Sequence, residues 1–114
     1  MEIIENHPLD ELEVGNRASL TRTFTQQGAQ IFALASGDVN PSHVDPEFAA
    51  NDPFHKMVAH GMWSAALVSN VLGTELPGPG AVYLSQNPKF LRPILVGDTV
   101  RATVTVTKIE VAVQ

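Results

Sequence analysis

Cysteine is absent from the 114 residues of this chain. That absence excludes disulfide bonds, a thiol nucleophile and a zinc–thiolate site within them, and it agrees with a reducing, cytoplasmic location. Charged side chains make up only 17% of the residues, and the Lys and Arg residues form no block in a chain whose formal net charge is −5. This balance argues against nucleic acid or an anionic membrane as a partner.

Long hydrophobic runs are also lacking. Residues 1–5 contain neither a basic residue nor a long apolar run, so they do not predict a signal peptide. The longest uncharged stretch, 57–74, contains His60, Ser69 and Asn70, and it therefore favours a buried helix over a membrane-spanning one. The length and the hydrophobic content of 44% predict a single globular domain over 1–114.

The most informative stretch is 32–50, which contains the pattern Gly37-Asp38-x-Asn40-Pro41-x-His43. Asn-Pro initiates turns, and Gly37 frees the backbone for an irregular path. A turn-forming loop of this kind can aim the carboxylate of Asp38 and the imidazole of His43 at one point. The pattern therefore predicts an acid–base pair.

This stretch resembles the hydratase signature of the MaoC-like family, the (R)-specific enoyl-CoA hydratases. The matching positions are Phe32, Ser36, Gly37, Asp38, Asn40, Pro41, His43, Asp45 and Ala49 or Ala50. The resemblance continues through His60-Gly61-Met62, Leu76-Pro77-Gly78-Pro79-Gly80 and Arg92-Pro93 with Val96-Gly97-Asp98, and so covers nearly the whole chain. Domains similar to this chain are also found fused to the N-terminal side of a phosphate acetyltransferase. An alternative expectation is therefore that this chain is the N-terminal part of such a fusion protein.

Local patterns predict strands at 18–25, 81–91 and 101–109 and helices at 26–35, 46–50 and 61–72. Thr25 and Asp45 are expected as helix N-caps, and Gly73 as the residue at which the third helix stops. Pro88 lacks a backbone donor, which should force an edge position or a bulge on its strand.

The helix at 61–72 is apolar on all sides and should therefore be surrounded. Valines and threonines alternate along 100–107, which predicts an antiparallel strand with one buried face. We therefore expect an α+β protein with the hot-dog fold, an antiparallel sheet wrapped around a central apolar helix, and the resemblance implies the same fold. About three strands are too few to wrap this helix, so we also expect the domain to be truncated at its C-terminus.

The resemblance implies reversible hydration of a trans-2-enoyl-CoA to the (3R)-hydroxyacyl-CoA, with Asp38 and His43 moving protons. In the alternative interpretation, Asp38 only caps a turn and His43 packs against it. Asn40 is either a contact for substrate or water, as in the family, or an Asx turn before Pro41. Gly61, at a helix N-terminus, is a candidate donor to the thioester oxygen or a glycine needed only for close packing.

His60 is expected to be a structural cap, because no spacing of His, Asp and Glu indicates a metal site. We expect no cofactor. Some family members have a serine six residues after the histidine of the second motif, where this chain has Ala66. That departure and the short C-terminus keep a non-catalytic acyl-CoA-binding or assembly module open as an alternative. A hot-dog thioesterase is the other, although 61–72 contains no carboxylate.

The expected partners are an acyl-CoA thioester and further copies of the chain, in a homodimer or a higher homo-oligomer. The strand edges have unpaired backbone groups, which can pair with another chain. The apolar helix also has too few strands to cover it, so association should be favoured over an isolated monomer.

Overall fold

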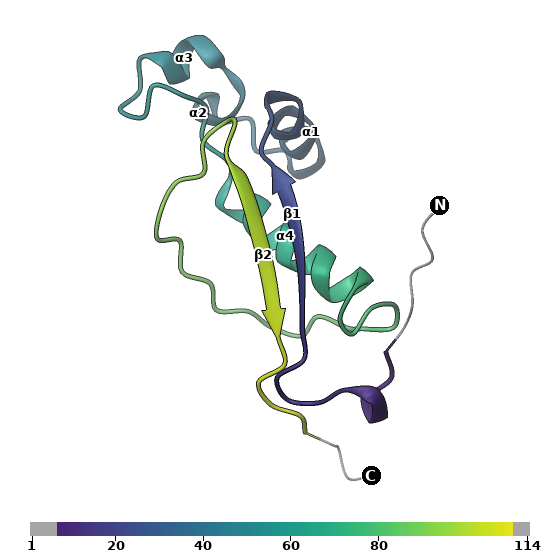
Figure 1. Ribbon diagram of the computed structural model, residues 1–114. Helices are drawn as coiled ribbons and strands as arrows, with labels where there is room; N and C mark the ends of the chain where they lie inside the picture. The colour runs from purple at the N-terminus through teal and green to yellow at the C-terminus, as the bar shows by residue number, and fades with distance from the viewer. Residues whose placement is uncertain (1–6, 111–114) are drawn as a thin grey trace. The chain divides into compact units, whose positions relative to one another are not determined.

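The computed structural model describes residues 7–110 (Figure 1). The elements in chain order are a 3₁₀ helix Leu9–Glu11, β1 Arg17–Thr23, α1 Gln26–Ser36, α2 Pro41–Val44, α3 Pro46–Ala50, α4 Gly61–Thr74 and β2 Thr99–Thr105. The residues of the chain divide into two compact units. Within the described part, the first unit comprises 7–20, 66–86 and 101–110, and the second comprises 21–65 and 87–100.

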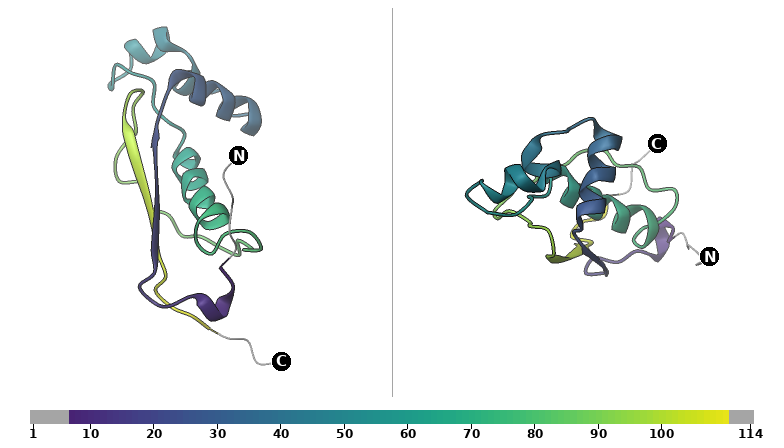
Figure 2. Two further views of the ribbon diagram at one scale, coloured as in Figure 1. Left: turned by 45° about the vertical axis from the view of Figure 1, so that its right-hand side comes forward. Right: turned by 90° about the horizontal axis from the view of Figure 1, so that it is seen from above.

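β1 and β2 form a two-stranded sheet (Figures 1 and 2). Residues 17–20 of β1 and 101–105 of β2 belong to the first unit, and residues 21–23 and 99–100 belong to the second. In the first unit, the hydroxyls of Ser19 and Thr103 are hydrogen-bonded at 3.1 Å. In the second unit, those of Thr23 and Thr99 are hydrogen-bonded at 2.9 Å. Residues further along β1 are therefore paired with residues earlier in β2. The two strands run antiparallel, as predicted.

The predicted alternation along β2 is confirmed. Ala102 is buried, Val100 and Val104 are half-buried, and the alternate residues Arg101, Thr103 and Thr105 are exposed. The expectation that this strand continues to 109 is wrong, because it ends at Thr105. Beyond Thr105 the backbone of Val106 still pairs with the chain before β1, where its N–H donates to the Asn16 carbonyl and its carbonyl accepts from the Gly15 N–H.

The second unit has its own apolar core, which holds the ends of α1, α3 and the segment before α4 together. The buried members are Phe24, Ala29, Ala49, Met57 and Ala59, with Trp63, Ile94 and Val96 packed against them. The rings of Phe24 and Trp63 meet edge to face, with centroids 5.2 Å apart. Burial of a side chain such as Phe24 stabilises the unit by about 1.5–3 kcal/mol. Within this unit α2 packs against both α1 and α3 (Figure 2).

Both helix N-caps are where the sequence placed them. Thr25 Oγ1 accepts a hydrogen bond from the Gly28 N–H at 2.9 Å. Asp45 Oδ1 accepts from the Glu47 N–H at 3.0 Å and from the Phe48 N–H at 3.3 Å. The predictions for α1 and α3 are therefore confirmed to within one residue.

Expectations about residues 81–91 and about α4 are wrong. Residues 81–91 form no strand, and Val82 and Leu84 are 79% and 90% exposed. A strand needs a neighbour for its N–H and C=O groups, and within 7–110 the sheet contains β1 and β2 only.

The helix α4 passes through Gly73 and ends at Thr74, whose hydroxyl donates to the Asn70 carbonyl at 2.7 Å. It is also not surrounded, since only Leu67 and Val71 of its side chains are buried. None of the helices in the described residues is long and apolar enough to cross a membrane.

Candidate active site

Asp38 lies in the short connection between α1 and α2, in the second unit. Gly37 ends α1 in the left-handed conformation, with φ of 81°, which a residue with a side chain rarely adopts. The Asn40 N–H then donates to Asp38 Oδ1 at 3.2 Å, while the Asp38 N–H donates to Ser36 Oγ at the same distance. These bonds hold the carboxylate in a turn and leave its side chain 54% exposed.

His43 lies on α2 and not on an irregular loop, which corrects the prediction. Pro41 stands in the first turn of this helix, where its fixed φ is favourable, and Asn40 is the N-cap. Asn40 Oδ1 accepts from the Ser42 N–H at 3.1 Å and from the Ser42 hydroxyl at 2.8 Å. Of the two interpretations of Asn40, the structure therefore shows the turn-capping one for this oxygen.

The ring of His43 is fixed by the backbone at Val58. Val58 pairs with Leu95 in an antiparallel bridge, and its N–H donates to the Ser42 carbonyl at 3.1 Å. His43 Nδ1 lies 2.6 Å from the Val58 carbonyl oxygen. Because a carbonyl can only accept, Nδ1 carries the hydrogen, and in the neutral ring Nε2 has the free lone pair.

His60 is the third member of the cluster, although only a structural cap was expected at this position. Its side chain is buried, and its Nε2 lies 2.9 Å from the Asp38 backbone oxygen and 3.8 Å from Asp38 Oδ2. Its ring stacks on that of His43, with centroids 4.1 Å apart and planes at 28°, and lies 4.9 Å from the ring of Phe32. The only signal for it in the sequence was its place in the His60-Gly61-Met62 motif.

Asp38, His43 and His60 each have a polar side-chain atom within 4.8 Å of the corresponding atoms of the other two. A water molecule that makes two hydrogen bonds of about 2.8 Å spans a separation of this size. The predicted pair of Asp38 and His43 is therefore brought together at a distance that one water can bridge. The three side chains are also of types that bind divalent metals, a grouping that sequence spacing could not reveal because it comes from three segments.

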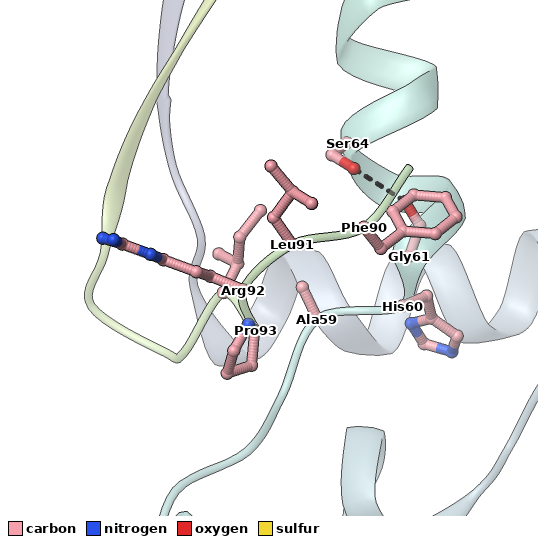
Figure 3. A pocket seen from close by; sticks show the side chains of 9 residues that line it. Ala59, His60, Gly61, Ser64, Phe90, Leu91, Arg92 and Pro93 are labelled. Carbon is pink, nitrogen blue, oxygen red and sulfur yellow. Dashed lines mark hydrogen bonds between the residues drawn. The ribbon is translucent and has the colours of Figure 1, made fainter. Parts of the chain in front are cut away.

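A cavity of about 340 Å³ lies beside His60, as Figure 3 shows. Its lining residues are Ala59, His60, Gly61, Ser64, Phe90, Leu91, Arg92, Pro93 and Ile94. The lining is mostly apolar, and the Arg92 side chain extends away from His60 (Figure 3). The cavity thus joins a titratable group to a surface that an acyl chain can contact.

Gly61 is the first residue of α4 and lines this cavity. Within 7–110, no backbone carbonyl accepts a hydrogen bond from its N–H, as is usual for the first residues of a helix. Its carbonyl accepts from the Ser64 hydroxyl at 2.7 Å (Figure 3). A Cβ at this position would lie 3.4 Å from the ring of Phe90, an ordinary contact, so packing alone does not require glycine here.

The chain as a whole is similar to known proteins. A family model described as MaoC-like domain matches residues 10–114. An "(R)-specific enoyl-CoA hydratase" of Rhodospirillum rubrum is 48% identical over 101 residues, which are 89% of this chain and 70% of that protein. A protein of the same name from Aeromonas caviae is 47% identical over 96 residues, 84% of this chain and 72% of that one.

A solved structure is similar as well. The unliganded R-hydratase PhaJ1 of Pseudomonas aeruginosa superposes with a TM-score of 0.88 at 44% identity, over 90% of this chain and 66% of that one. The chain therefore spans about two-thirds of the length of that structure. This likeness, with the antiparallel strands and the helices described above, confirms the α+β class and the hot-dog fold predicted from the sequence.

Proposed function

We propose that this chain, which belongs to the MaoC-like domain family, catalyses the reversible hydration of a trans-2-enoyl-CoA to the (3R)-3-hydroxyacyl-CoA. The observation that carries the proposal is the cluster of Asp38, His43 and His60, whose polar side-chain atoms lie within 4.8 Å of one another and whose member His60 also lines an apolar cavity. The names of the relatives in Rhodospirillum rubrum and Aeromonas caviae support the same activity and its R-specificity.

The addition of water to an enoyl thioester requires two proton transfers. As the water oxygen bonds to the β-carbon, a proton leaves the water, and the π electrons move through the α-carbon towards the thioester oxygen. A proton then reaches the α-carbon, so that the elements of water have been added across the double bond. The Asp38 carboxylate and the His43 Nε2 lone pair can hold one water and carry these protons as general acid and base.

The negative charge that develops on the thioester oxygen needs a donor. Gly61 lines the cavity and is the first residue of α4, where the helix dipole favours negative charge. A glycine also leaves space for the thioester to approach the backbone. We therefore assign the Gly61 N–H as the oxyanion donor.

The remaining assignments are also proposals. Arg92, at the rim of the cavity, is the nearest candidate for the phosphates of CoA, because the net charge of −5 makes a local cation necessary. We further propose a homodimer or a higher homo-oligomer and a cytoplasmic location. No cofactor takes part in the reaction as written.

The decisive experiment is a hydration assay with crotonyl-CoA. We expect the absorbance of the conjugated thioester to fall, and the product to resist oxidation by an (S)-specific 3-hydroxyacyl-CoA dehydrogenase. Release of free CoA would instead indicate a thioesterase, and binding without turnover would indicate a non-catalytic module. Either result would overturn the proposal.

A further inference from the structure

His60 has two contacts that involve both members of the acid–base pair. Its Nε2 is 2.9 Å from the backbone oxygen of Asp38, and its ring stacks on that of His43 at a centroid separation of 4.1 Å. The side chain is 3% exposed, so both contacts are shielded from water. All three residues lie in the second unit.

The hydrogen-bond partners determine which nitrogen of His60 carries the hydrogen. The Asp38 carbonyl can only accept, so Nε2 must be the donor. His60 Nδ1 is buried and has no hydrogen-bond partner among the described residues. The tautomer with hydrogen on Nε2 therefore leaves no buried N–H without an acceptor, whereas hydrogen on Nδ1 would leave one and would be destabilising.

We infer that His60 is a positioning residue for the proposed hydration: it holds the Asp38 backbone through Nε2–H and supports the His43 ring by stacking. The inference rests on the proposed function. Asp38 needs such a support, because its loop is exposed and its other hydrogen bonds to described residues are within 36–40. A shift of about 1 Å in a catalytic group can lower a rate by about 10²-fold, so loss of this support should reduce turnover.

Two substitutions separate the hydrogen bond from the space that the ring fills. His60→Gln keeps an N–H donor near the position of Nε2, whereas His60→Leu fills a similar volume without a donor. We expect kcat with crotonyl-CoA to fall roughly 10- to 100-fold in His60→Leu and only several-fold in His60→Gln. The unfolding midpoint in urea is measured for both variants, so that a loss of folded protein is not taken for a loss of positioning.

His55 provides a matched control. Its Nδ1 also lies 3.0 Å from a backbone carbonyl, that of Ala50, but the side chain is exposed and outside the cluster. His55 has a positive φ of 57°, which asparagine tolerates, so His55→Asn is the suitable change. We expect its kcat to stay within twofold of the original protein.

A second measurement does not depend on variants or on activity. The nitrogen resonances of the imidazoles, recorded on protein labelled with ¹⁵N, should show His60 with hydrogen on Nε2 and a free lone pair on Nδ1. The opposite tautomer, or a His60→Leu variant with unchanged kcat, would overturn the inference about His60. A failure of the original protein to hydrate crotonyl-CoA would count against the proposed function, while the tautomer would still test the His60 contact.

Discussion

The ring of Phe90 lies 3.4 Å from the point where a Cβ on Gly61 would stand. The gap leaves room for a methyl group but for little more. The absence of a side chain at 61 thus keeps the cavity open next to an N–H that has no helical partner. A methyl group at 61 would therefore fit the packing but would obstruct the cavity, so the effects on stability and on catalysis can be tested separately.

Gly61→Ala is expected to fold normally and to lose activity. The new methyl group makes an ordinary contact with Phe90 but occupies the space assigned to the thioester. The N–H itself is kept, but the methyl group holds the thioester oxygen away from it, so we expect kcat/KM for crotonyl-CoA to fall about 10- to 10³-fold, an effect similar to the loss of an oxyanion donor. Steady-state kinetics and urea unfolding measure the two effects.

Gly73→Ala is the matched control within the same helix. A Cβ at 73 would meet nothing within 4 Å, and the residue is not among those with positive φ. Alanine in a helix is favoured over glycine, so the free energy of unfolding should rise by about 0.4–1 kcal/mol while turnover stays unchanged. Equal losses of activity in the two variants would contradict the role of Gly61.

Asp38→Asn and His43→Gln should each lower kcat by a factor of about 10² to 10⁴, because both groups serve proton transfer. Asparagine at 38 can still accept the Asn40 N–H, so the turn should be kept. Steady-state rates at saturating crotonyl-CoA are the measurement. Asp10→Asn, an exposed change in the other unit, serves as the control. Near-normal turnover in either site variant would remove that residue from the mechanism.

Thr25→Ala should destabilise α1, the helix that leads into the Asp38 turn. The substitution removes the oxygen that caps the Gly28 N–H, and loss of such a cap costs about 0.5–2 kcal/mol. Thr25→Ser keeps the oxygen and should cost much less. Urea unfolding compares the two, and equal destabilisation would show that the methyl group of Thr25 matters more than its hydroxyl.

The features that local chemistry determines could be predicted from the sequence. Thr25 and Asp45 cap their helices through atoms within three residues, and the alternation of β2 follows from which side chains are apolar. The four-residue helix at Pro41–Val44 was missed because it is too short to show a period. Its cap and its proline were nevertheless visible.

The features that depend on distant contacts could not be predicted. A strand at 81–91 would require a neighbour, and pattern alone does not say whether one is present. Asp38 and His60 are 22 residues apart along the chain, and only the fold brings His60 Nε2 to the Asp38 carbonyl. Asp38 and His43 were found because both lie in one short motif, whereas His60 was assigned to a cap.

Association with further copies of the chain is the last prediction. Val82 and Leu84 expose apolar side chains at 79% and 90%, and residues 81–86 make no strand of their own. Burial of each such side chain would contribute about 1.5–3 kcal/mol, and the unpaired backbone can accept another strand. We therefore expect light scattering at low protein concentration to show a dimer or a larger species. Leu84→Lys should shift it towards the monomer, whereas Gln30→Lys, which adds the same charge at an exposed polar position on α1, away in sequence from 81–86, should not. A monomer in the original protein, or equal dissociation in both variants, would contradict the prediction.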